Sequence, residues 1–220
     1  KEKRTGPPLP ETEVGFADTY ADAAFMDGKS AAERDALIDQ ARQGYQRALS
    51  RDPKSRSALV GLSRLYTRAE DKPHAVASLR TALQHHPKDH DLAFQLARTQ
   101  ATFGDWAGAA EAAQFALSLD PENRTYHKTL GVALARQARW DEAFATLTKA
   151  MPEADARYFL GREMFNQNKP EDGKQWVQYA VAADPTHANA KQFLTDLEGP
   201  PAGTPGTTGI ATVDHREPGK

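Results

Sequence analysis

The sequence predicts an all-α solenoid of about five helix-turn-helix repeats, ended by a C-terminal capping helix. Three observations lead to this prediction. Prolines recur at a nearly constant interval, an alanine stands five residues before most of them, and apolar residues at helical spacing fill the stretches between. A single hairpin of this kind cannot bury its apolar face alone, so neighbouring hairpins must stack to form the core.

The recurring prolines set the length of the repeat. They are separated by 34, 34, 31 and 33 residues and stand at Pro53, Pro87, Pro121, Pro152 and Pro185. A proline disfavours helical backbone at the residue before it and can itself open the next helix, so each one marks the end of a hairpin. The alanine before four of these prolines lets two helix backbones approach closely, and it recurs at Ala48, Ala82, Ala116 and Ala180.

In chain order, we expect a polar tether over residues 1–15, a repeat domain over residues 16–198 and a disordered tail over residues 199–220. The tether is expected because its three prolines cannot enter a helix interior. The tail is expected because its Gly-, Pro- and Thr-rich composition lacks the apolar residues that offset the entropy of ordering. The expected repeats and the cap helix span approximately residues 16–53, 56–87, 90–121, 124–152, 154–185 and 187–197.

Three of these repeats depart from the regular pattern, the fifth because Pro170 and Gly173 replace the usual aromatic and alanine. An insertion, Asp27–Asp35, displaces the first helix of the first repeat, and the fourth repeat is three residues short at Met151-Pro152. Two tryptophans, Trp106 and Trp140, stand at equivalent positions where second helices open. Because large aromatics at helical spacing usually belong to the core, we expect both to pack between helices rather than to face a ligand.

The pattern of small residues within the period resembles the tetratricopeptide repeat family. In that family a small residue stands eight positions into the repeat, alanines follow at positions twenty and twenty-seven, and a proline stands at position thirty-two. The third repeat carries this pattern on Leu96, Ala97, Gly104, Trp106, Ala109, Ala116 and Pro121. The resemblance covers residues 16–197 and implies a right-handed superhelix, whose first helices line a concave groove that binds protein partners.

Carried over to this sequence, the groove positions of the family are mainly basic. They hold six basic residues against two acidic ones, Asp91 and Asp155, together with three aromatics. Arginine engages a carboxylate bidentately and aromatic rings bury area at low entropic cost, so we expect an extended, acidic peptide as the ligand. The alternative is that the arginines only solvate a helix face. The candidate groove residues are Arg64, Arg68, Phe94, Arg98, Lys128, Arg136, Tyr158, Arg162 and Phe165.

Composition and motifs argue against several other functions. The net charge is -2 with 26% charged residues, which gives no reason to expect nucleic acid as a partner. There is no cysteine, and no apolar run approaches the length of a membrane-spanning helix. The histidines between His85 and His90 match no zinc-binding spacing, and carboxylates such as Asp105 are expected to cap helices. We therefore expect no enzymatic activity, no metal and no cofactor.

The expected function is that of a protein interaction scaffold or adaptor, whose partner the sequence does not identify. The alternatives are a self-assembling repeat protein and an auxiliary interaction domain of a larger enzyme or of an export or envelope complex. The chain begins at Lys1 rather than Met, so we expect that an upstream segment was removed. Together with the polar tether, this favours an exported or membrane-anchored bacterial protein, and a cytoplasmic location is the alternative.

Overall fold

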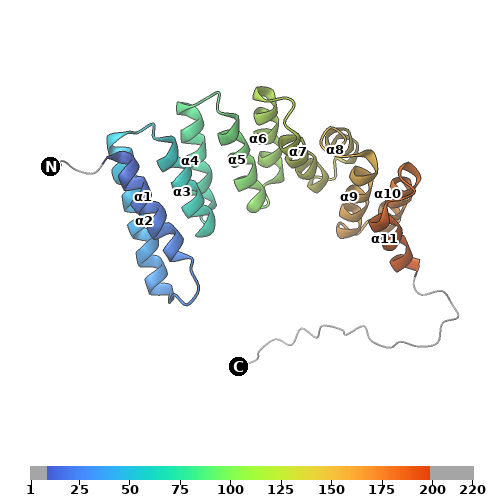
Figure 1. Ribbon diagram of the computed structural model, residues 1–220, viewed down its shortest axis with the longest axis horizontal. Helices are drawn as coiled ribbons and strands as arrows, with labels where there is room; N and C mark the ends of the chain where they lie inside the picture. Colours follow the sequence, from blue (N-terminus) through green and yellow to red (C-terminus); the bar gives the residue numbers. More distant parts are fainter. Residues whose placement is uncertain (1–8, 199–220) are drawn as a thin grey trace.

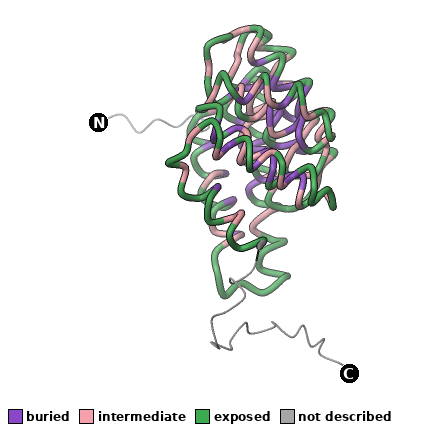
Figure 2. The backbone as a smooth tube through the Cα atoms, turned by 90° about the vertical axis from the view of Figure 1, so that its right-hand side faces the viewer, coloured by how far each residue is buried: buried purple, intermediate pink, exposed green. Residues whose placement is uncertain are grey.

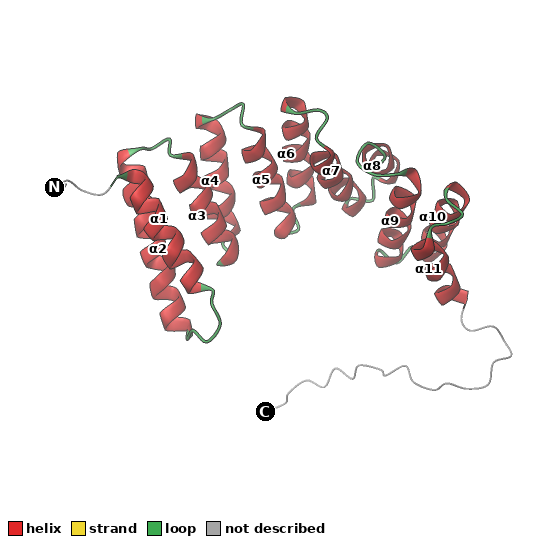
Figure 3. Ribbon diagram, in the orientation of Figure 1, coloured by secondary structure: helices red, strands yellow, loops and turns green. Residues whose placement is uncertain are grey.

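The computed structural model describes residues 9–198 of the chain, and every regular element in that range is an α-helix. Eleven helices occur in these residues, and the first ten pair as five helix-turn-helix hairpins that follow one another along an arc (Figure 1, Figure 3). No strand is present between residues 9 and 198. The predicted all-α array of hairpins is therefore confirmed. The predicted tail and the first eight residues of the predicted tether lie outside the described residues.

Each hairpin consists of a first helix and a second helix in chain order. The first helices are α1 Pro10–Ala24, α3 Arg56–Arg68, α5 His90–Thr102, α7 Arg124–Arg136 and α9 Glu153–Asn166. The second helices are α2 Ala31–Arg51, α4 Lys72–His85, α6 Trp106–Leu119, α8 Trp140–Leu147 and α10 Pro170–Ala183. Helix α11, Ala188–Glu198, follows the fifth hairpin.

The first hairpin differs from the sequence prediction at both of its helices. Helix α1 begins at Pro10, so the tether prediction is wrong for residues 10–15. A proline fits the first helical position because the backbone N–H that it lacks would have no partner there. The inserted residues mainly lengthen α2, which begins at Ala31. Ser30 starts that helix with a capping box, in which Ser30 and Glu33 each accept a backbone N–H of the other.

The turn inside each of the four later hairpins contains one residue in the left-handed region of backbone conformation. The backbone φ is between +58° and +71° at Glu70, Gly104, Ala138 and Asn168. This conformation turns the chain so that the next amide can donate back to a carbonyl of the first helix. The N–H of Asp71, for example, lies 2.8 Å from the carbonyl oxygen of Tyr66. Each hairpin therefore closes by the same local geometry.

The fourth hairpin is the irregular one, because its second helix, α8, has only 8 residues. Arg157 on α9 bridges this short helix and α10. Its guanidinium carbon lies 4.7 Å from the ring centre of Phe144 on α8, and 5.8 Å and 5.5 Å from those of Trp176 and Tyr179 on α10. Glu153 pairs with the same guanidinium at 2.7 Å. One side chain thus links three helices where the repeat is shortest.

The core runs as a row of small clusters between the helices, with exposed residues on the outside (Figure 2). The alanines that recur before the prolines are fully buried at Ala48, Ala82, Ala116 and Ala180. At Gly131 on α7, an added Cβ would come within 2.5 Å of Leu147 Cγ on α8. Small residues therefore stand where helix backbones approach closely, as the periodic pattern indicates.

Candidate functional site

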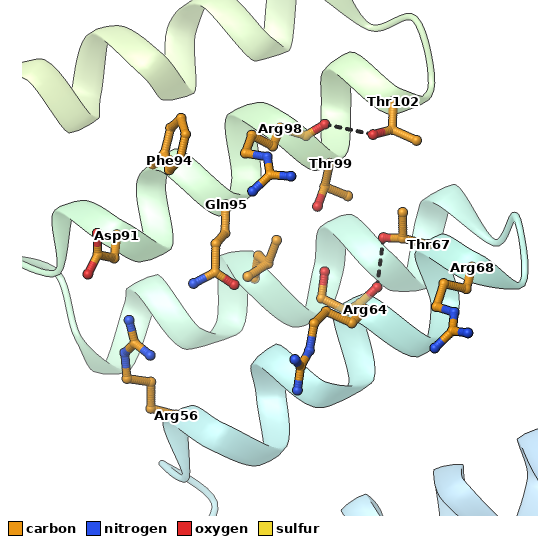
Figure 4. A pocket seen from close by; sticks show the side chains of 12 residues that line it. Arg56, Arg64, Thr67, Arg68, Asp91, Phe94, Gln95, Arg98, Thr99 and Thr102 are labelled. Atoms are coloured by element: carbon orange, nitrogen blue, oxygen red, sulfur yellow. Dashed lines mark hydrogen bonds between the residues drawn. The ribbon is translucent and has the colours of Figure 1, made fainter. Parts of the chain in front are cut away.

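The candidate site is a cavity of about 610 Å³ between α3 and α5, the first helices of the second and third hairpins (Figure 4). It contains four of the nine residues that sequence reasoning selected, Arg64, Arg68, Phe94 and Arg98. Leu79 of α4 also lines it. The remaining lining residues are mostly polar: Arg56, Ser63, Thr67, Asp91, Gln95, Thr99 and Thr102.

Two arginines of the cavity are paired with carboxylates of α1. Arg64 Nη2 lies 3.2 Å from Asp18 Oδ1, and Arg68 Nη1 lies 3.0 Å from Asp22 Oδ1. The Arg68 guanidinium also lies 4.2 Å from the ring centre of Phe25. Part of the positive charge that the sequence predicts for the groove is therefore neutralised within the chain.

Sequence reasoning missed the two acidic partners. It placed the first helix of the first repeat as displaced by the insertion, and so assigned no groove positions to it. The available signal was the spacing of Asp18 and Asp22, which four residues apart share one face of a helix. In the structure that face meets α3 across a second, smaller cavity of about 270 Å³, lined by both aspartates and by Arg64 and Arg68.

A third arginine, Arg56, is also paired. Its Nε lies 2.6 Å from Asp89 Oδ2, and the hydrogen bond from Arg56 lowers the pKa of the Asp89 carboxyl. Asp89 in turn caps α5, since its Oδ1 accepts from the Leu92 N–H at 3.0 Å. Arg56 is thus held by a structural contact that fixes the start of α5.

Arg98 is the exception among the four arginines. Its side chain is exposed and forms no ion pair with any residue in the range 9–198. Its guanidinium carbon lies 5.8 Å from the ring centre of Phe94, one turn earlier on α5. Ion pairing is expected to hold the other three in place, so Arg98 is the cationic group best able to engage a ligand without breaking an internal contact.

Two hydroxyl groups also line this cavity. They belong to Ser63 and Thr99, residues that are 2% and 9% exposed, and neither hydroxyl has a hydrogen-bond partner within the described part of the chain. Both hydroxyl oxygens keep contact with the open space of the cavity, since neither is among the fully buried unpaired atoms. Beside them, the half-buried Gln95 amide also has no side-chain partner among the described residues. These groups can accept and donate hydrogen bonds to a molecule in the cavity.

At the other end of the cavity, Asp91 belongs to a polar cluster with the neighbouring hairpin. The Tyr126 hydroxyl donates to Asp91 Oδ1 at 2.9 Å and lies 2.7 Å from His90 Nδ1. Burial and the Asp91 contact raise the pKa of Tyr126 to about 12, so the phenol stays protonated and donating at neutral pH. Asp91 was expected as a groove residue, and the structure places it in the cavity with Arg98 (Figure 4).

The other basic residues that were selected lie outside this cavity. Lys128 and Arg162 are exposed on α7 and α9, and no ion pair joins either one to another described residue. Arg136 is engaged instead: its Nε lies 2.9 Å from Oε2 of Glu163, and its guanidinium lies 5.3 Å from the ring centre of Trp106. Glu163 is only 6% exposed, so Arg136 neutralises a buried carboxylate.

The two aromatics selected on α9 are packed against α11. Phe193 of α11 lies edge-on to both rings, at 6.2 Å from the Tyr158 ring centre and 5.1 Å from that of Phe165. His187 lies 5.1 Å from the Tyr158 ring and accepts the N–H of Ala190 at its Nδ1, which fixes the start of α11. Tyr158 and Phe165 therefore hold α11 in place. Of the three selected aromatics, Phe94 is the one that lines the cavity between α3 and α5.

Neither a metal-binding cluster nor a membrane-spanning helix occurs among the described residues. No group of three side chains in residues 9–198 is arranged to hold a metal ion. Two of the three histidines near the start of α5 have other contacts, since His86 Nε2 lies 2.8 Å from the Lys54 carbonyl and His90 contacts Tyr126. In the same range, none of the helices combines the length and the apolar character that crossing a bilayer requires.

Comparison with known structures gives the same architecture. The chain superimposes on YrrB, described as a TPR protein with an unusual peptide-binding site, with a TM-score of 0.55 and 22% identity over 82% of this chain and 89% of that one. For a structure of MamA the TM-score is 0.57 and the identity is 15%, over 81% of this chain and 96% of that one. For MamA from Desulfovibrio magneticus RS-1 the TM-score is 0.56 and the identity is 10%, over 80% of this chain and 97% of that one. At these identities the likeness concerns the fold.

The family assignment comes from the sequence. No curated protein matches the chain. A sequence model described as tetratricopeptide repeat matches residues 30–90 and 94–154, which together make up more than half of the chain. No enzyme family is found, and the fold is typical of non-catalytic scaffolds that bind proteins. The chain therefore belongs to the tetratricopeptide repeat family.

Proposed function

We propose that this protein is an interaction scaffold that binds an extended, acidic peptide segment of a partner protein on the face formed by its first helices. The observation that carries the proposal is the cavity between α3 and α5, with the unpaired Arg98 beside Phe94. An arginine next to an aromatic ring offers a carboxylate two hydrogen bonds and a neighbouring side chain an apolar contact. The similar fold of YrrB, described as having a peptide-binding site, supports a peptide as the ligand.

Two further cations extend the same surface along the array. Lys128 on α7 and Arg162 on α9 are exposed and have no ion pair within residues 9–198. With Arg98 they give one free cation on each of three successive first helices. Because an exposed ion pair contributes only about 0–1 kcal/mol, binding is expected to need several of these contacts and to weaken as added salt screens the charges.

A charge reversal tests the proposal. Arg98→Glu combined with Arg162→Glu should reduce recovery of partner proteins from an extract of the source organism by more than half, while the circular dichroism spectrum stays unchanged. The matched control is Arg80→Glu combined with Lys149→Glu, which reverses two exposed, unpaired cations on α4 and after α8. Equal recovery by the native protein and the first variant contradicts the groove as the binding surface.

Self-association is a second candidate function, favoured by one observation on α1. Phe16 and Tyr20 lie one turn apart on this helix and are 56% and 38% exposed. Large apolar side chains on the end face of a repeat array are suited to pack against another copy. Light scattering after size-exclusion chromatography distinguishes the two functions, since a monomer at micromolar concentration excludes stable assembly through α1.

A further inference from the structure

We propose that the cavity between α3 and α5 takes a single carboxylate side chain, an aspartate or a glutamate of the bound peptide, and that Arg98 alone recognises its charge. This inference rests on the proposed function and makes it more specific. The sequence suggests a stripe of equivalent cations that would favour a run of acidic residues. Within the cavity between α3 and α5, the contacts indicate instead that one arginine is available for a ligand, while the other three are paired with internal carboxylates.

The pairing of the neighbouring arginines is the first argument. Asp18, Asp22 and Asp89 lie between 2.6 and 3.2 Å from Arg64, Arg68 and Arg56 respectively. A ligand carboxylate that approached one of these three would have to compete with a tethered internal carboxylate. It would also be repelled by that carboxylate. Arg98 has no paired carboxylate among residues 9–198, and Asp91, the carboxylate that lines the same cavity, lies at its other end and accepts from the Tyr126 hydroxyl (Figure 4). The attraction for an acidic side chain is therefore concentrated at Arg98.

The uncharged groups of the cavity are the second argument. The hydroxyls of Ser63 and Thr99 and the amide of Gln95 line the cavity and have no side-chain partners in the described part of the chain. A carboxylate has about four acceptor sites, of which a guanidinium fills two. Hydroxyl or amide groups can donate hydrogen bonds to the remaining acceptor sites, whereas phenyl or aliphatic side chains cannot. Phe94, on the same helix, leaves an apolar contact for the residue beside the acidic one.

The number of free cations also distinguishes a carboxylate from a phosphate. Phosphorylated side chains carry about -1.5 to -2 charges at neutral pH and are typically bound by clusters of arginines. Of the four arginines here, Arg98 alone has no carboxylate partner within residues 9–198. The cavity therefore suits the single charge of aspartate or glutamate better than a phosphoserine.

Peptide arrays test this inference directly with the full chain. One array holds randomised decapeptides with a fixed central Asp or Glu, a second has Asn or Gln at that position, and a third has phosphoserine. Native protein should prefer the first array over the second by up to about fivefold, the largest effect expected of one exposed ion pair. Arg98→Gln should abolish the preference. The matched control, Arg64→Gln, removes an arginine of the same cavity and should keep it.

The outcomes separate this inference from the proposed function. Loss of the preference in Arg64→Gln or Arg68→Gln rather than in Arg98→Gln overturns the assignment to Arg98, while peptide binding to the groove stands. An equal gain in affinity from each acidic residue placed directly beside the fixed position, or a clear preference for phosphoserine over Asp, overturns the single-carboxylate inference in the same way. If native protein binds no peptide on any array, the proposed function itself fails.

Discussion

At Gly131 the absence of a side chain lets α7 lie against α8. Glycine inside a helix normally destabilises it by about 0.5–1 kcal/mol relative to alanine, so Gly→Ala should stabilise an open site. At Gly131, however, the new Cβ would collide with Leu147, which is fully buried and has little room to move. We expect Gly131→Ala to lower the free energy of unfolding by about 1–3 kcal/mol, as overpacking does. Urea denaturation followed by circular dichroism measures the change.

The chain supplies a control for this substitution. Gly15 also lies inside a helix, α1, but nothing stands within 4 Å of the position that its Cβ would take. Gly15→Ala should therefore raise the free energy of unfolding by up to about 1 kcal/mol. If both variants change stability in the same direction, close approach of α7 and α8 is not what requires glycine at position 131.

Single residues also show where sequence reasoning stopped. The buried alanines and Gly131 follow from the repeat period, because the close contact recurs with it. The left-handed turn residues do not, since Glu70, Ala138 and Asn168 give no glycine signal and the neighbouring helices impose their conformation. The ion pairs of the cavity arginines could not be predicted from the sequence either. They depend on which side chains of two different helices meet, and periodicity within one helix carries no such information.

Among the helices, α9 carries Arg157, whose side chain adds a contact to each of the two second helices that flank it. A guanidinium over an aromatic face contributes about 0.5–1 kcal/mol at an exposed site and more where water is excluded. Arg157 approaches three such rings and is largely covered, with 24% of its side chain exposed. We expect Arg157→Ala to lower the free energy of unfolding by about 1–3 kcal/mol, measured by urea denaturation.

Arg157→Lys distinguishes the stacking from the charge. Lysine keeps the pairing with Glu153 but lacks the planar group that lies against several rings, so it should recover less than half of the loss. Full recovery by lysine would mean that charge alone holds the three helices together, contrary to this account.

The helices themselves were predictable to different degrees. From α3 to α11, apolar periodicity and the prolines fix which segments are helical, because each segment repeats a pattern seen elsewhere in the chain. At the N-terminal hairpin that comparison fails. Pro10 opens α1 instead of preventing it, and Ser30 with Glu33 starts α2 early through a local capping box rather than through the repeat. Local cap chemistry outweighed the repeat pattern there.

At the scale of the whole molecule, the charges of the groove are less free than a count of residues suggests. Arg64, Arg68 and Arg136 each have an internal carboxylate partner. The net excess of positive charge is consequently smaller than the sequence indicates, and it lies on Arg98, Lys128 and Arg162. The family pattern indicates the first helices as the place of the candidate site. The pairing of its arginines could not be predicted, because the acidic partners come from α1 and from the adjacent repeat.

Helix α8 is the shortest second helix, and its small contact area affects how the array unfolds. Its buried residues are only Ala143 and Leu147, the fewest of any second helix in residues 9–198. In a linear array each repeat touches only its neighbours, so one weak repeat near the middle limits cooperativity between the two sides. We expect the backbone amides of α8 to exchange with deuterium faster than those of α4 and α6, measured by mass spectrometry. The three hairpins before it and the helices after it would then unfold as two separate units, and uniform protection across the fourth hairpin would show a single cooperative molecule instead.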